Sequence, residues 1–257
     1  MAASVDLGSL LTDPFTLRTV FSVLAGALTG LVVVRLTFFL HNQRDLFRAL
    51  RAVRAELLYD SDALERLARL LRDDMRRQHV DLPIEVPAGT TIEVRYVLSL
   101  PGALSTAAFD QLRQSGRLFD LPEPTRRALF DLYETVERIN RLRGHREALQ
   151  YNSVGNVHLV VDAAGLDLEP GETATEAELP AGVRDQLEAL RRLRRATQGI
   201  NASILRLAAS ISPPERVETL GLAEFAAADD EREPPTIEEA VAMLDSIEAS
   251  SFWARFV

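Results

Sequence analysis

The sequence predicts a mainly α-helical protein, in which one N-terminal transmembrane helix is followed by a cytoplasmic bundle of long helices. Residues 19–40, TVFSVLAGALTGLVVVRLTFFL, form an apolar run that only Arg35 interrupts with a charge. Most of the remaining chain combines charged residues with apolar residues that recur at helical spacing. Aromatic residues make up only 6% of the chain, which favours aliphatic helix packing over a β-sandwich.

The apolar run is long enough to cross a bilayer. A helix of about 22 residues rises about 33 Å, and a hydrocarbon core is about 30 Å thick. A cleaved signal peptide is one alternative, but Asp6 and Asp13 precede the run with Arg18 as the only basic residue there. A buried soluble helix is the other alternative, and the length of the run and the lack of polar alternation through 20–34 argue against it.

Flanking charge predicts the orientation of this helix. Arg44, Arg48, Arg51 and Arg54 follow the run, and positive residues stay on the cytoplasmic side. We therefore expect a cell-membrane protein with a short extracytoplasmic N-terminus, residues 1–18, and a cytoplasmic C-terminal part. Arg44, Arg48 and Arg51 are candidates for contact with lipid headgroups.

Two patterns suggest association between copies of the chain. Ser22, Gly26 and Gly30 recur every fourth residue, and this spacing allows close approach of two transmembrane backbones, although glycine is also common in membrane helices. Beyond the run, leucines recur at every seventh position, at Leu50, Leu57, Leu64 and Leu71. This seam predicts either a coiled coil between copies or one long helix packed on later helices of the same chain.

The second alternative for the leucine seam is favoured for two reasons. Asp60 and Asp74 interrupt the apolar positions that lie between the leucines, and several helices follow in the sequence. The two patterns also face different ways. Gly30 and Leu50 are twenty residues apart, which is about 200° around a straight helix, so a break at residues 41–42 would be needed to align them.

Residues 42–212 are expected to form the helical domain. After the first helix, residues 91–99 and 156–162 are β-branched and predict strands that pair into a small two-stranded β ribbon. Ser105 is a candidate N-cap for a helix that stops at Gly116. Two long helices are predicted from Pro124 to about residue 150 and over 181–212, with Leu118, Phe119 and Leu121 as an apolar plug between helices.

The C-terminal part is expected to be an acidic, proline-containing linker, residues 213–235, followed by a helix over 236–257. Thr236 and Glu239 match a capping box that opens this helix. The helix ends in an aromatic tail with Phe252, Trp253 and Phe256, which we regard as a candidate contact for a protein partner.

No residue pattern predicts a reaction. The chain has no cysteine, which excludes disulfides and thiolate chemistry, and no lysine, which indicates codon bias or adaptation to high salt. Its four histidines lack metal-ligand spacing, so neither a metal nor a cofactor is expected. A net charge of −9 argues against a nucleic-acid partner. Arginine clusters at 138–146 and 191–195 fit either lipid headgroups or ion pairs with nearby carboxylates, and the ion pairs are favoured.

Residues 100–144 read LPGALSTAAFDQLRQSGRLFDLPEPTRRALFDLYETVERINRLRG. This stretch resembles a segment of an uncharacterised family of membrane-anchored, all-helical prokaryotic proteins, which also place a transmembrane helix first and a charged helix after it. The resemblance covers about a fifth of the chain. It implies an all-α cytoplasmic domain and carries no known activity, so no catalytic residue can be transferred.

The sequence thus predicts a membrane-tethered helical scaffold or protein-interaction module, with the lipid bilayer and a protein partner or second copy as its partners. A sensor or regulatory module that relays a change across the membrane is the alternative. An enzyme of unrecognised type is a third hypothesis.

Overall fold

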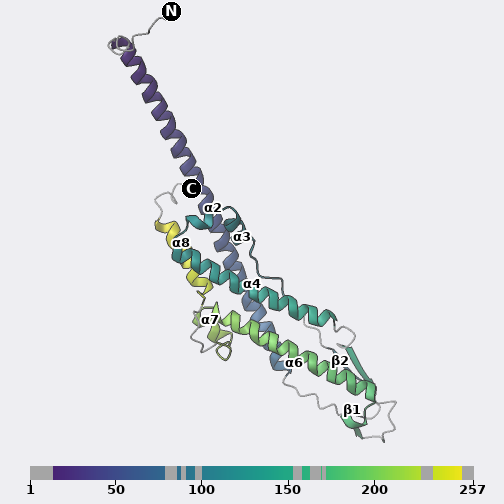
Figure 1. Ribbon diagram of the computed structural model, residues 1–257. Coiled ribbons are helices and arrows are strands. Elements are labelled where there is room, and N and C mark those ends of the chain that lie inside the picture. The colour runs from purple at the N-terminus through teal and green to yellow at the C-terminus, as the bar shows by residue number, and fades with distance from the viewer. Residues whose placement is uncertain are drawn as a thin grey trace, which may run out of the picture.

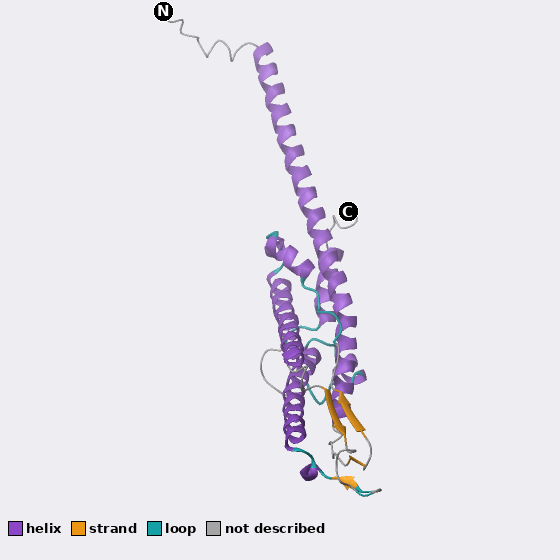
Figure 2. Ribbon diagram, turned by 90° about the vertical axis from the view of Figure 1, so that its right-hand side faces the viewer, coloured by secondary structure: helices purple, strands orange, loops and turns teal. Residues whose placement is uncertain are grey.

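The computed structural model describes residues 14–78, 86–87, 91–95, 100–152, 158–162, 169, 172–226 and 234–250 of the chain. The first thirteen residues of the expected extracytoplasmic segment and the aromatic tail lie outside these ranges. The described residues are mainly helical, as the sequence predicts, and two short antiparallel strand pairs accompany the helices (Figures 1 and 2).

One long helix organises the molecule. Helix α2 runs without interruption over Pro14–Gln78, 65 residues, which corresponds to a length of about 97 Å. Its N-terminal half projects away from the rest of the chain, and its C-terminal half lies within the bundle (Figure 1). The helix has no break at residues 41–42, so the apolar run and the leucine seam belong to one rod.

The other helices pack along the C-terminal half of α2. They are α3 (Ala107–Gln114), the short 3-10 helix η1 (Arg117–Asp120), α4 (Glu123–Asn152), α6 (Ala181–Ser210), α7 (Pro214–Thr219) and α8 (Ile237–Ser250). A further 3-10 turn, η3, covers Glu176–Glu178. Helices α3, α6 and α8 contact α2, and α4 contacts α6 and α8.

The predicted β ribbon is confirmed. Strand β2 (Thr91–Arg95) pairs antiparallel with β3 (His158–Asp162), with Thr91 opposite Asp162 and Arg95 opposite His158. A shorter pair, β1 (Val86–Pro87) with β4 (Thr173–Ala174), was not predicted. Both pairs lie at the end of the bundle that is far from the projecting part of α2 (Figure 2).

The leucine seam of α2 forms the centre of the chain's own core. Leu50, Leu57, Leu64 and Leu71 are at most 3% exposed and belong to one apolar cluster with residues of α3, α4, α6 and α8. The hypothesis of a coiled coil between copies is therefore corrected in favour of packing on later helices. The four leucines contact other helices of the same chain, so their side chains have no exposed surface for a second copy.

Local signals at helix ends are largely confirmed. Gly116 ends α3 with a φ of 74°, a left-handed conformation that suits glycine. Thr236 and Glu239 form both hydrogen bonds of the capping box at the start of α8, at 2.9 and 3.2 Å. The prediction of Ser105 as the N-cap of α3 was wrong by one residue, because the N-cap is Thr106, which forms no side-chain capping bond. A carboxylate of α2 takes over that role, as described below.

The expected linker differs from the structure over residues 213–226. This stretch contains α7 and buries Leu220 and Leu222 in the core, although its acidic composition had indicated a solvated linker. Helix α8 also buries Ile237, Ala240 and Leu244 in that core and belongs to the bundle.

Candidate functional site

The projecting part of α2 is the most exposed apolar surface among the described residues. Its large apolar side chains from Val20 to Leu40 are 36–74% exposed. It is also the only described helix that is long and apolar enough to cross a membrane, by length and composition. Soluble proteins seldom expose a continuous apolar surface of this kind.

The small residues predicted for self-association lie within this exposed part. Ser22, Gly26 and Gly30 are exposed, and no atom lies within 4 Å of a Cβ placed at either glycine. Because α2 is continuous, the 200° offset between Gly30 and Leu50 holds without a break. The small-residue face therefore points nearly opposite to the face that carries the bundle.

The apolar run ends where the bundle begins. Arg44 and Arg48 are exposed there and form no ion pair with another described residue. Arg51 is different, because it pairs with Glu248 of α8 at 2.6 Å. Arg54 pairs with Asp245 at 2.7 Å, so α8 runs antiparallel to α2 and ends beside this region.

A buried carboxylate of α2, Glu56, organises the start of α3. It accepts hydrogen bonds from the Ser105 hydroxyl at 2.7 Å and from the Ala108 and Phe109 amides at 2.8 and 3.3 Å. It also accepts one from the Tyr133 hydroxyl of α4 at 2.8 Å. Helix N-termini favour negative charge, so Glu56 acts as an N-cap supplied by another helix.

A second buried carboxylate, Asp60, lies one turn further along α2. Its Oδ1 accepts the Ser105 amide at 2.8 Å, whereas its Oδ2 has no hydrogen-bond partner among the described residues. Burial raises the pKa of Asp60 from 3.8 to about 7; the Ser105 amide opposes this rise, and the charge of Glu56 adds to it. Burial, followed by the charge of Glu56, raises the pKa of the Tyr133 phenol, which keeps it a hydrogen-bond donor.

A third polar group joins α2, α4 and α6. Arg146 is fully buried, and its guanidinium donates to Asp74 at 3.3 Å and to the Asn201 amide oxygen at 2.7 Å. Asn201 also donates to Asp74 at 2.9 Å. Elsewhere in the two arginine clusters, ion pairs form between Arg143 and Glu147 and between Arg191 and Glu176. For these arginines the ion-pair alternative is the one that the structure shows.

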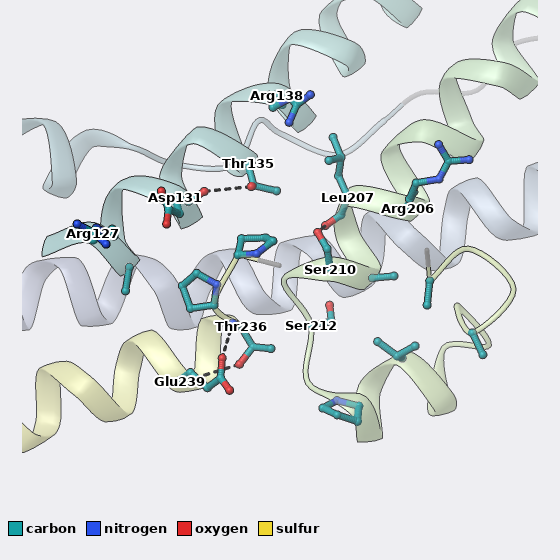
Figure 3. Close-up of a pocket in the computed structure, with 18 of the residues that line it drawn as sticks. Arg127, Asp131, Thr135, Arg138, Arg206, Leu207, Ser210, Ser212, Thr236 and Glu239 are labelled. Atoms are coloured by element: carbon teal, nitrogen blue, oxygen red, sulfur yellow. Dashed lines mark hydrogen bonds between the residues drawn. The ribbon is translucent and has the colours of Figure 1, made fainter. Parts of the chain in front are cut away.

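An open groove lies between α4, the end of α6, α7 and the start of α8 (Figure 3). Its volume of about 1420 Å³ is above the range typical of small-molecule sites. Three arginines line it, Arg127, Arg138 and Arg206, and so do acidic residues that include Asp131 and Glu239. The groove is therefore a surface of mixed charge.

The polar groups of the groove are engaged locally rather than aimed at one point. Arg127 pairs with Glu123 at 2.9 Å, and the Thr135 and Ser210 hydroxyls donate to backbone carbonyls of their own helices. Within the ranges described, no three His, Asp or Glu side chains are placed to hold a metal ion.

Sequence reasoning missed the buried carboxylates as a group. Glu56 reads as one charge among many on a helix, and Asp60 and Asp74 read as defects in the seam. The signal that marks them is their helical spacing, because positions 56 and 60 are one turn apart and near the buried seam. Asn140 of α4 is half-buried, and its amide exchanges two hydrogen bonds with the Leu104 backbone, at 2.9 and 3.0 Å.

The described residues thus define a helical bundle built on one long helix whose N-terminal part is apolar and exposed. Comparisons with family models, with curated protein sequences and with solved structures gave no match.

Proposed function

We propose that this chain is a membrane-tethered helical interaction module, with α2 crossing the bilayer and the bundle on the cytoplasmic side. The observation that carries the proposal is the complete exposure of the apolar run on a helix that continues directly into the core. Leaving one large apolar side chain in water instead of burying it costs about 1.5–3 kcal/mol. A bilayer removes that cost for the whole run.

The charges around the run support the same placement. Arg44 and Arg48 lie within about two turns of Leu40, exposed and on the side that the positive-inside rule assigns to the cytoplasm. Arg35 lies within the run, about one turn before its end, and its side chain is long enough to reach the headgroup layer. The resemblance of residues 100–144 to membrane-anchored prokaryotic proteins agrees with this architecture.

The experiment that tests the tether is fractionation of the full chain expressed in cells. We expect the protein to stay in the membrane fraction after carbonate treatment and to resist protease added outside intact cells. Release by carbonate contradicts the membrane-spanning helix. Digestion of the bundle in intact cells contradicts the orientation but leaves the span in place.

The interaction role rests on two surfaces of the described residues, the mixed-charge groove and the small-residue face of α2. The tail with Phe252, Trp253 and Phe256 lies outside the described residues and stays a candidate contact from the sequence alone. The groove fits a protein segment, and the small-residue face fits a second copy. The acidic net charge favours neither DNA nor RNA as the partner.

Crosslinking in native membranes followed by mass spectrometry identifies the partner. We expect crosslinks from the groove or the tail to one protein, and their absence with the tether intact contradicts the interaction role. Removal of residues 251–257 tests the tail and keeps the whole of α8, which ends at Ser250. Removal of 236–257 does not serve this purpose, because it also removes the buried residues of α8.

A sensor or regulatory module is the second candidate, and the continuity of α2 is the observation that favours it. A rod with no break couples movement in the bilayer directly to the bundle. Introducing a hinge with His41→Gly and Asn42→Gly separates the two roles. A tether keeps its partner crosslinks in this variant, whereas a relay that depends on a rigid α2 changes them.

A further inference from the structure

Phe119 is an exposed aromatic residue at a corner of the bundle. It belongs to η1 and is 70% exposed, whereas its neighbours Leu118 and Leu121 are buried. The sequence had indicated all three as an apolar plug between helices, so for Phe119 that prediction was wrong. A single exposed apolar residue is ordinary in itself, and its position in the molecule is what matters here.

The contacts of Arg117 show where this corner lies along the axis of α2. The Arg117 guanidinium donates to the Asn42 carbonyl at 2.6 Å and pairs with Asp45 at 3.3 Å. Asn42 and Asp45 follow the last residue of the apolar run, Leu40, by two and five positions. At about 1.5 Å per residue, the Arg117 guanidinium therefore lies about 3–8 Å beyond the end of the run along the helix axis.

The charge around Phe119 suits the boundary between lipid and water. The Arg126 guanidinium lies over the Phe119 ring, 5.7 Å from its centre, and Arg126 forms no ion pair with another described residue. Arg44 is exposed at the same level of α2, and Arg48 is exposed about one turn further from the run. Asp120 and Glu123 are exposed acids nearby; Glu123 pairs with Arg127, and Asp45 is engaged by Arg117. Aromatic rings concentrate at the headgroup level of membranes, and arginines there attract anionic lipid.

We propose that the corner formed by Arg117, Phe119 and Arg126 lies against the headgroup layer of an anionic membrane and fixes the tilt of the bundle. This inference rests on the proposed function, because it requires α2 to cross the bilayer. The span alone leaves the bundle free to tilt. Contact at this second point holds the groove and the end of α8 in one orientation toward the membrane.

Tryptophan quenching by brominated lipids tests the contact in the full chain. The chain's one tryptophan is first removed with Trp253→Phe. Single tryptophans are then introduced with Phe119→Trp, with Tyr59→Trp as the control, and with Leu31→Trp inside the apolar run. Each variant is reconstituted in vesicles of phosphatidylcholine and phosphatidylglycerol that carry bromine on the acyl chain, near the headgroup for Phe119→Trp and Tyr59→Trp and near the chain end for Leu31→Trp.

Tyr59 is a matched control, because it is 61% exposed and follows Leu40 by nineteen residues, about 28 Å along the helix. We expect quenching in Phe119→Trp to exceed that in Tyr59→Trp at least about twofold. Adding Arg126→Gln is expected to reduce the excess, and vesicles of phosphatidylcholine alone are expected to do the same.

The three positions separate the possible outcomes. If Leu31→Trp and Phe119→Trp are both quenched, both proposals stand. If Leu31→Trp is quenched and Phe119→Trp behaves like Tyr59→Trp, the corner contact is overturned and the tether stands. If Leu31→Trp is not quenched, the tether itself is overturned. Shielding of Phe119→Trp from both lipid and aqueous quenchers overturns the lipid contact in favour of a protein contact.

Discussion

Asp74 of α2 and Arg146 of α4, 72 residues apart in sequence, meet in an ion pair of 3.3 Å inside the bundle. The side chain of Arg146 is fully buried and that of Asp74 is 10% exposed. Asn201 of α6 hydrogen-bonds to both, so the pair ties three helices together. The apparent defect in the leucine seam at Asp74 is therefore the site where the bundle accommodates a buried arginine.

Asp74→Ala is expected to destabilise the chain strongly, because it leaves the Arg146 charge buried without its carboxylate. Removing one partner of a buried pair typically costs about 3–5 kcal/mol. Chemical denaturation of the detergent-solubilised chain, followed by circular dichroism, measures the loss. Glu188→Ala is the matched control, since its pair with Arg192 is on the surface and its removal is expected to leave the unfolding midpoint almost unchanged. Equal midpoints for the two variants contradict a stabilising role for the buried group.

Glu56→Ala is expected to release the start of α3. The change removes the acceptor of four hydrogen bonds and leaves the Ala108 amide and the Tyr133 hydroxyl without it. We expect a loss on the order of 2–4 kcal/mol. Hydrogen exchange at the Ala108 and Phe109 amides is the specific readout, and it should accelerate more than exchange in the centre of α6. Glu123→Ala, which removes a surface carboxylate, should leave the exchange of these two amides unchanged.

Asp60 makes stability depend on pH. Its folded-state pKa is raised to about 7, so between about pH 4 and 7 the folded chain holds a proton that the unfolded chain releases. The contribution of Asp60 to the free energy of unfolding is therefore full below about pH 4, falls as the pH rises to about 7, and is then constant.

Asp60→Asn tests this dependence. The amide keeps an acceptor for Ser105 and carries no charge, so the variant should be more stable than the natural chain at pH 8, by up to about 4 kcal/mol. At pH 4 the two should be nearly equal. Parallel pH profiles for both proteins would show that Asp60 does not titrate in this range.

Gly26→Ile with Gly30→Ile tests self-association through the small-residue face. Bulky side chains at these positions prevent close approach of two helices, and we expect association in vesicles to weaken at least about tenfold, or about 1.4 kcal/mol. Energy transfer between labelled full-length chains measures it. Leu28→Ile changes the opposite side of the same turn and should have no effect. Unchanged energy transfer in the double variant contradicts self-association through these glycines. Their role is then ordinary packing of the helix against lipid.

Gly221→Ala is expected to destabilise the turn after α7. Gly221 has a φ of 61°, and an added Cβ would lie 2.6 Å from Nη1 of Arg72, which donates to the Leu220 carbonyl. The strained φ and the close contact with Arg72 together should lower the free energy of unfolding by about 1–3 kcal/mol. Gly199→Ala is the control, because that position is helical and open, and alanine there should raise the unfolding midpoint slightly.

Local patterns predicted the helices and their ends well. The apolar run, the stop at Gly116 and the capping box of Thr236 and Glu239 depend on neighbours in sequence, so the sequence alone is enough to recognise them. The partners of the β ribbon were also predicted, because only two segments of the chain are rich in β-branched residues between turns. The predicted linker over 213–226 was wrong, since its acidic composition concealed the buried Leu220 and Leu222.

What the sequence determined by itself is the class of fold and the long apolar helix, because helical periodicity and hydropathy are properties of neighbouring residues. Only the tertiary structure decided the roles of Glu56, Asp60 and Asp74, the exposure of Phe119 and the existence of the groove. Each of these depends on which distant helix lies opposite a given side chain. That choice follows from the packing of the whole core, and a one-dimensional pattern does not contain it.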